Sequence, residues 1–302
     1  MKEVKGRQLL GSFLAGRTER THRAYQGDLE AFGVFLGAED AAAAVERLVR
    51  SGQGTANSMV LAFRARMRRD RLSPATINRR LATLRSLVKH ARMLGEVIWT
   101  LDVPNVRRET YRDTRGPGRA GFERLVARLE GRSEPRALRD RAAVRMLFDL
   151  ALRRAEVVSL DLEHVDLEAG TVSVLGKGRG SRERLTLPPP TRAALEDWIA
   201  VRGQTPGPLL VNFDRAAKGA RLTGRSLHRI VVALGRDTGQ RVTPHGLRHA
   251  AITEALDLTN GNVRAVQRFS RHRDLRVLGV YDDSRADLGG QVAHLVATGG
   301  KR

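Results

Sequence analysis

The sequence predicts a mainly α protein that carries a small β-sheet and folds as two domains. Apolar residues recur at intervals of three and four through most of the chain, which is the spacing of amphipathic helices. Two short segments alternate instead, on either side of a glycine-rich turn, as the strands of a hairpin do. The 302 residues are enough for two cores, and segment 102–119 interrupts both patterns. We therefore place a helical domain at 1–101, a linker at 102–119 and a mixed domain at 120–302.

Four helices are expected in the first domain. Thr21 is predicted to cap the first helix, whose apolar face has three- and four-residue spacing through Tyr25, Leu29, Phe32 and Phe35. The next two helices are expected over 41–49 and 56–69. The fourth, over 73–95, opens with a Ser-Pro pair, which is typical of an N-cap followed by the first helical turn.

The charge of the chain indicates a polyanionic partner. The formal net charge is +21, from 48 Arg and 6 Lys against 33 acidic residues. GC-rich codon usage explains why arginine replaces lysine, but it does not explain why cations outnumber carboxylates, and nucleic acid is the usual polyanion for such a chain. The absence of cysteine excludes a disulfide framework, a cysteine-ligated zinc site and a thiol nucleophile.

Cations line the fourth expected helix and continue into the linker, which is rich in arginine, proline and glycine. Arg85, Lys89 and Arg92 lie four and three residues apart, away from the apolar stripe. Aligned cations on a rigid helix can follow a phosphate backbone, and an ordinary solvated surface is the alternative. The candidate DNA-binding residues are Arg79, Arg80, Arg85, Lys89, Arg92, Arg107 and Arg108.

The second domain mixes helices with the hairpin. The expected hairpin strands are TVSVL and RERLTL, joined by the turn GKGRGS. A Thr-Pro entry opens the helix in TPHGLRHAAITEALDL, and two or three short helices follow it. The other helices are expected at 121–129, 137–151, 191–201 and 223–238.

The second domain also contains the residue types that metal-free phosphodiester cleavage requires. That reaction needs a nucleophile, cations that stabilise the pentavalent phosphate and a proton donor for the leaving oxygen. The sequence has no HExxH motif and no Walker glycine loop, so no metal or other cofactor is expected. The candidates are Arg153 and Glu156 in LALRRAEVVSL, Lys177 in GKG, His245 and Arg248 in TPHGLRHAA, and His272 and Tyr281 in FSRHRDLRVLGVYDD.

These strings resemble the sequence boxes of the tyrosine recombinase, or phage integrase, family. The order arginine, lysine, HxxR, histidine and tyrosine matches over most of 120–285. THRAYQGDLEAF and SPATINRRLATLRSLVKHA resemble the family's core-binding domain. The resemblance implies an N-terminal helical, SAM-like core-binding domain and a mixed α+β tyrosine-recombinase catalytic domain. Because the core-binding domain starts the chain, we expect a simple two-domain, Xer-like or mobile-element type of site-specific recombinase, which acts without metal or ATP.

The resemblance assigns the main chemical roles. Arg153 and Arg248 would clamp the non-bridging oxygens of the scissile phosphate. Tyr281 would attack phosphorus, leaving a 3′-phosphotyrosine and a free 5′-hydroxyl. Lys177, on the hairpin, would protonate the departing 5′-oxygen.

The two histidines and Glu156 take supporting roles by the same resemblance. His245 would hydrogen-bond the phosphate and assist proton transfer at the tyrosine, and His272 would add another hydrogen bond. Glu156 would support the folded site around Arg153. The family commonly has glycine immediately before the second histidine, where this chain has Arg271. Two interpretations are open: Arg271 contacts DNA, or it alters the turn.

The resemblance also implies partners and a location. We expect double-stranded DNA core sites arranged as inverted repeats, a monomer in free solution and a homotetramer on DNA. Accessory DNA-bending proteins are further expected partners, no membrane partner is expected, and the location is cytoplasmic, at the nucleoid. The tail 287–300 has helical apolar spacing at Leu288, Val292, Leu295 and Val296, which predicts packing into a neighbouring protomer. Packing on its own domain is the alternative.

Two other functions are consistent with parts of this pattern. A type IB topoisomerase shares the chemistry and works as a monomer, but the core-binding resemblance and the tail argue against it. A catalytically silent DNA-binding regulator on the same scaffold would not need the complete set of candidate catalytic residues.

Overall fold

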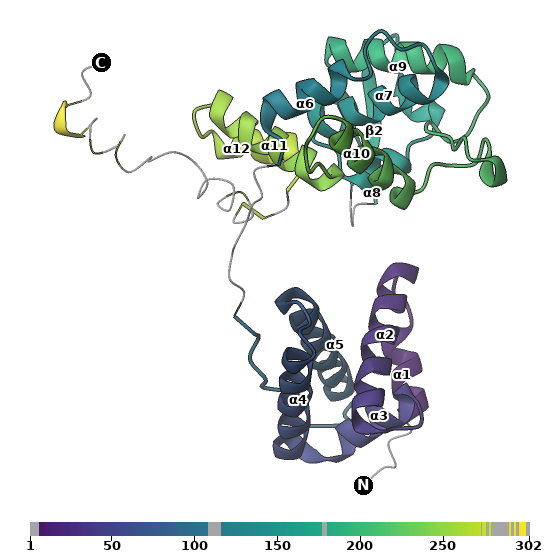
Figure 1. Ribbon diagram of the computed structural model, residues 1–302. Helices are drawn as coiled ribbons and strands as arrows, with labels where there is room; N and C mark the ends of the chain where they lie inside the picture. The colour runs from purple at the N-terminus through teal and green to yellow at the C-terminus, as the bar shows by residue number, and fades with distance from the viewer. Residues whose placement is uncertain are drawn as a thin grey trace. The chain divides into compact units, whose positions relative to one another are not determined.

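The computed structural model describes residues 6–107, 116–176 and 180–272, together with 274–275, 278, 290, 293 and 296–299 (Figure 1). The chain divides into two compact units, Met1–Tyr111 and Arg112–Arg302, each with its own hydrophobic core. Most described residues are helical and one small sheet is present, so the predicted fold class is confirmed. Within the described residues, no helix is both long and apolar enough to cross a bilayer.

The N-terminal unit is a helical bundle. Its described helices are α1 (Gly6–Leu14), α2 (Glu19–Leu36), α3 (Ala41–Arg50), α4 (Gly52–Arg69) and α5 (Pro74–Met93). Helix α3 packs against α1, α2 and α4, and α5 packs against the same three helices. The centre of the bundle is apolar and fully buried at Leu29, Phe32, Leu48, Val60 and Leu81.

The N-terminal unit differs from the sequence prediction at the start of two helices and in one additional helix. Thr18, rather than Thr21, caps α2, because the Thr18 hydroxyl accepts a hydrogen bond from the Thr21 backbone N–H at 3.4 Å. Helix α4 starts four residues before the predicted position, at Gly52. Helix α1 was not predicted. It packs closely on α3 because Gly6 has no side chain. A Cβ atom at this position would lie 2.3 Å from a backbone oxygen of α3.

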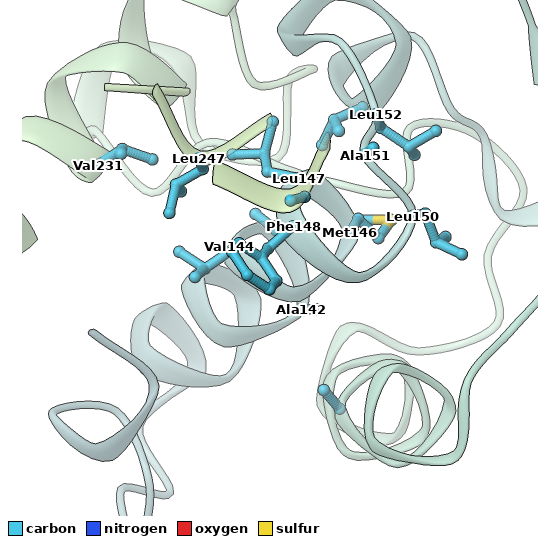
Figure 2. Packing of buried hydrophobic residues seen from close by; sticks show 14 of the residues in the cluster. Ala142, Val144, Met146, Leu147, Phe148, Leu150, Ala151, Leu152, Val231 and Leu247 are labelled. Atoms are coloured by element: carbon cyan, nitrogen blue, oxygen red, sulfur yellow. The ribbon is translucent and has the colours of Figure 1, made fainter. Parts of the chain in front are cut away.

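The second unit is built around a central helix. Its helices are α6 (Gly118–Ala127), α7 (Pro135–Asp149), α8 (Arg154–Val158), α9 (Pro189–Arg202), α10 (Gly224–Asp237), α11 (Pro244–Leu258) and α12 (Val263–Ser270), with short 3-10 helices at Leu162–His164 and Arg215–Ala217. Helix α7 packs against α6, α8, α9 and α11. Figure 2 shows Val144, Leu147 and Phe148 of α7 in the same buried cluster as Val231 of α10 and Leu247 of α11.

The sheet of the second unit has three antiparallel strands in the order β1-β2-β3: β1 (Val165–Asp166), β2 (Thr171–Leu175) and β3 (Arg182–Thr186). The predicted hairpin is confirmed, and Ser173 pairs with Arg184 in its register. Val172 and Val174 of β2 are buried in the core, which holds the hairpin against the unit. Strand β1 was not predicted, because two residues are too few for an alternating pattern.

Candidate active site

Arg153 lies immediately before the short helix α8, and Glu156 lies within the first turn of that helix. The Arg153 backbone N–H donates to Oε2 of Glu156 at 2.8 Å, and its Nη1 donates to Oε1 at 2.7 Å. Glu156 is only 3% exposed. Burial alone would raise the pKa of Glu156, but the Arg153 N–H and the charges of Arg271 and Arg153 outweigh burial and lower that pKa. The carboxylate is therefore ionised at neutral pH and holds the Arg153 side chain.

Arg248, on α11, joins three segments that are far apart in the sequence. It is 2% exposed, and its Nη1 and Nη2 donate to the carbonyls of Ala151 and Ser270. Nη2 also lies 3.4 Å from Nε2 of His272. The loop before α8, helix α11 and the end of α12 therefore meet at this guanidinium.

His272 is held by the end of α12. Its Nδ1 lies 2.9 Å from the Ser270 hydroxyl, and its carbonyl accepts a hydrogen bond from the Gln267 side chain at 3.1 Å. Burial, and then the nearby charges of Arg248 and three further cationic or titratable residues, lower the pKa of His272 to about 4. The imidazole is therefore neutral at neutral pH, with one N–H to donate.

His245 is exposed in the first turn of α11, and His249 lies buried one turn further along the helix. The two Nε2 atoms are 2.6 Å apart, with the rings nearly perpendicular. Partial burial of the imidazole, followed by the charges of Arg248 and Arg153, lowers the pKa of His245, so it too is neutral at neutral pH. Their four-residue spacing was visible in the sequence, but it did not reveal that His249 orients His245.

The residue before His272 does not face solvent. Arg271 is 5% exposed, which argues against the interpretation that it contacts DNA. Its backbone is left-handed, with φ 56° and ψ 36°, and it ends α12. That backbone is one that glycine also adopts, so the structure does not support the interpretation that Arg271 alters the turn. Burial lowers the pKa of Arg271, although the Glu156 carboxylate opposes this change.

Two candidate catalytic residues fall outside the described residues. These are Lys177, which comes between β2 and β3 in the sequence, and Tyr281. Arg108 and most of the tail 287–300 lie outside them as well. The structure therefore brings together Arg153, Glu156, Arg248 and His272, with His245 on the helix that carries Arg248.

The described candidate DNA-binding cations of the N-terminal unit fall into two groups, of which the first pairs with other residues of the protein. Asp28 is 2% exposed and accepts hydrogen bonds from Arg79 and, at 2.8 Å, from Thr83, while Arg80 lies 3.8 Å from it. Arg85 donates to the Val103 carbonyl and to Asn105, at 2.6 and 2.7 Å. The other group is exposed and consists of Lys89, Arg92 and Arg107.

One group among the described residues has metal-ligand chemistry: Asp161, Glu163 and His164. Its atoms already have protein partners, since His164 Nδ1 accepts the Asp161 backbone N–H at 2.8 Å and Arg221 donates to the Asp161 carboxylate. This arrangement serves the local fold and does not indicate a metal centre.

Comparisons with known proteins show which family the chain resembles. The model of the phage integrase family matches residues 120–287. The tyrosine recombinase slr0733 of Synechocystis sp. is 36% identical over 287 residues, covering 93% of this chain and 91% of the relative. The tyrosine recombinase Synpcc7942_B2651 of Synechococcus elongatus is 39% identical over 291 residues, covering 93% and 90%.

Two solved structures share the fold. The Tn1549 transposon integrase, in complex with transposon right end DNA, has a TM-score of 0.74 at 15% identity and covers 98% of this chain and 100% of its own. A lambda integrase dimer bound to a COC′ core site has a TM-score of 0.69 at 13% identity, with 93% and 96% covered. The chain therefore belongs to the phage integrase family and is a tyrosine recombinase, an enzyme that breaks and rejoins DNA strands at specific sites.

Proposed function

We propose that Tyr281 is the nucleophile of this recombinase and that Arg153 and Arg248 clamp the phosphate that it attacks. The observation that carries the proposal is the meeting of three distant segments at Arg248, beside His272. Two guanidiniums close to a neutral imidazole form a cationic, donor-rich site, which suits the charge that develops on a pentavalent phosphate.

In the proposed reaction the tyrosine oxygen forms a bond to phosphorus while the bond to the 5′-oxygen breaks. Lys177 gives a proton to the departing oxygen, and the tyrosine proton passes to His245, whose lowered pKa leaves it free to accept one. His272 donates a hydrogen bond to the phosphate. The 5′-hydroxyl of another strand reverses these steps and releases the tyrosine.

We assign DNA binding to both units. The N-terminal unit, residues 1–101 by the sequence boundary, is the core-binding domain, and 120–302 is the catalytic domain, with the basic segment 102–119 between them. The exposed cations Lys89, Arg92 and Arg107 support a contact with phosphates. The Tn1549 and lambda integrases in complex with DNA support a duplex as the partner.

Assembly into a homotetramer on DNA is the further part of the proposal. Recombination joins four strand ends from two duplexes, so it requires four active sites. A cavity of about 540 Å³ between α7, α11 and α12 has an apolar lining that includes Phe148, Ala251, Leu258, Val266 and Phe269. The apolar residues of the tail 287–300 of a neighbouring copy fit such a lining. A chain truncated after Arg285 should not form the tetramer on DNA, and normal assembly of that chain would contradict this role.

Covalent capture tests whether Tyr281 is the nucleophile and also identifies the DNA sequence that the protein cleaves. The protein is incubated with randomised duplexes nicked at many positions, so that the strand beyond a cut diffuses away and the phosphotyrosine persists. DNA that stays covalently attached to the protein in denaturant is sequenced. A duplex of that sequence is then synthesised, and we call it the captured duplex. The Tyr281→Phe protein should capture none, and capture at the wild-type level by that protein would refute the assignment.

The same duplex separates recombination from topoisomerase activity. Two captured duplexes that carry different flanks should exchange strands and yield hybrid products. Relaxation of supercoiled plasmid without hybrid products would instead favour the topoisomerase alternative.

A further inference from the structure

Arg271 occupies an unusual position at the end of α12. Its backbone is left-handed, a conformation that favours glycine, and its side chain is buried. A charged side chain is seldom buried unless other groups pair with it, because burial removes its hydration. The position therefore combines a strained backbone with a costly side chain, and a specific set of partners must offset both.

The guanidinium has four such partners on two segments. Nη1 donates to the carbonyls of Leu150 at 3.1 Å and Phe269 at 3.0 Å. Nη2 donates to the Ala151 carbonyl and to Oε2 of Glu156, both at 3.1 Å. Three of these partners, Leu150, Ala151 and Glu156, lie in or beside the loop before α8, 115 to 121 residues earlier in the chain. Arg271 thus bridges the end of α12 to that loop.

Both arginines of the proposed phosphate clamp share partners with Arg271. The Ala151 carbonyl also accepts a hydrogen bond from Arg248, and the Glu156 carboxylate also accepts from Arg153. The Arg271 carbonyl in turn accepts from Nη2 of Arg153 at 3.4 Å. Displacing the Arg271 side chain would therefore change the partners of both clamp residues.

We propose that Arg271 is a positioning residue for strand cleavage, which holds the loop that carries Arg153 against the turn that carries His272. The inference rests on the proposed function, since it assigns Arg271 to the same phosphate site without contact to the phosphate. Glycine at this position would permit the same turn but would remove the Arg271 bridge, leaving Arg248 and Arg153 as the described side chains that link the two segments. Arginine lacks the conformational freedom of glycine in this left-handed turn, but its side chain links the loop that carries Arg153 to the turn that carries His272.

The first experiment compares Arg271→Gly with the wild type on the captured duplex. Glycine fits the left-handed backbone, so the variant removes the bridge without adding strain. We expect the single-turnover rate of covalent complex formation to fall about 100-fold, the size of effect that a small misplacement of catalytic groups produces, while the Kd for the duplex stays unchanged. Arg264→Ala, which removes an exposed arginine from the same helix, is the matched control and should behave as wild type.

Chemical rescue separates positioning from a general loss of structure. Guanidinium chloride, at concentrations well below those that unfold the protein, should refill the vacated site and restore part of the Arg271→Gly rate, with no effect on Arg264→Ala. Arg271→Lys keeps the charge but cannot reach the three carbonyls and the carboxylate, so its rate should also be low. If Arg271→Gly does not fold, Arg271→Lys carries the same comparison of rate against Kd. A wild-type rate in the folded variants, a parallel rise in Kd, or a failure of rescue in folded Arg271→Gly would overturn the proposal.

A second experiment needs no DNA, so it distinguishes this inference from the proposed function. Backbone hydrogen exchange is followed by mass spectrometry in the DNA-free protein, for the wild type, Arg271→Gly and Arg271→Lys. Loss of the bridge should speed exchange both around 271–272 and around 150–153. Faster exchange around 271–272 alone would overturn the inference even where covalent capture succeeds. If exchange becomes faster in both segments but the wild-type protein captures no DNA covalently, the result would count against the proposed function and not against this inference.

Discussion

Each unit holds two arginines beside one buried carboxylate, and the units differ in what else those arginines touch. In the N-terminal unit, Asp28 of α2 binds Arg79 of α5, whose side chain is 49% exposed. In the catalytic unit, Glu156 binds Arg153 and the buried Arg271, and the backbone carbonyls of Leu150 and Ala151 also accept hydrogen bonds from Arg271. The same pair of groups therefore ties two helices together in one unit and joins two segments of the proposed phosphate site in the other.

The difference follows from hydration. A guanidinium that keeps one side in water needs a single protein partner, and its ion pair contributes little to stability. A guanidinium removed from water needs a partner for each polar edge, so several segments must agree on one arrangement. A buried arginine and its partners consequently adopt one defined geometry, and side chains that clamp a phosphate need such a geometry.

The largest effect on stability should appear when Glu156 and Asp28 are neutralised in two separate variants. Glu156→Gln leaves Arg271 buried without its counter-charge, so the catalytic unit should lose about 4 kcal/mol of unfolding free energy. Asp28→Asn should cost the N-terminal unit only about 1–2 kcal/mol, because Arg79 can regain water. Trp99 and Trp198 lie one in each unit, so variants that keep a single tryptophan report each unfolding transition by fluorescence in urea. Equal losses in both units would refute the comparison.

Removing a buried arginine of the site should affect chemistry more than removing an exposed one elsewhere. We expect Arg248→Ala to slow covalent capture about 10²–10³-fold, the usual cost of losing one stabilising donor at a developing charge. Arg50→Ala is the matched control, because its exposed side chain pairs only with Glu46 among the described residues. The measurement is the single-turnover rate on the captured duplex, and a rate for Arg248→Ala close to that of the control would contradict the clamp.

The catalytic unit should also be the more sensitive of the two to mild acid. His272 has its pKa lowered to about 4 in the folded protein, whereas the unfolded chain binds this proton near the ordinary value of about 6.5. Between these pH values the unfolded state binds more protons, so stability falls as pH falls. Urea unfolding followed through Trp198 should show this loss, and His272→Asn should flatten it. An unchanged pH profile in that variant would exclude His272 as the source.

The smallest effect concerns the exposed cations of the N-terminal unit. Lys89→Ala or Arg92→Ala should reduce the slope of log affinity against log salt by about 0.9, the value for one lost phosphate contact on duplex DNA. Fluorescence anisotropy with a labelled duplex of arbitrary sequence is sufficient, because such contacts are independent of base sequence. Arg50→Ala should leave the slope unchanged, and slopes equal to wild type in both lysine and arginine variants would remove this helix from the interface.

Local patterns predicted the elements that depend on neighbouring residues. The hairpin, and the helix opened by Thr243 and Pro244, follow from alternation and capping, which operate within a few residues. The contact between Arg153 and Glu156 also spans only three residues, but the family resemblance, and not a local pattern, predicted that Glu156 supports Arg153. Helix α1 was missed because its burial depends on α3, and its own apolar pattern is short.

The sequence by itself determined the fold class, the order of the boxes that identify the family, and the chemical groups available for cleavage. It could not determine which of 48 arginines would be buried, exposed or paired. That outcome depends on carbonyls and carboxylates supplied by distant segments, as Leu150, Ala151 and Glu156 do for Arg271. A charged side chain has no preferred environment until its partners are assembled, so only the tertiary structure decided the place of Arg271.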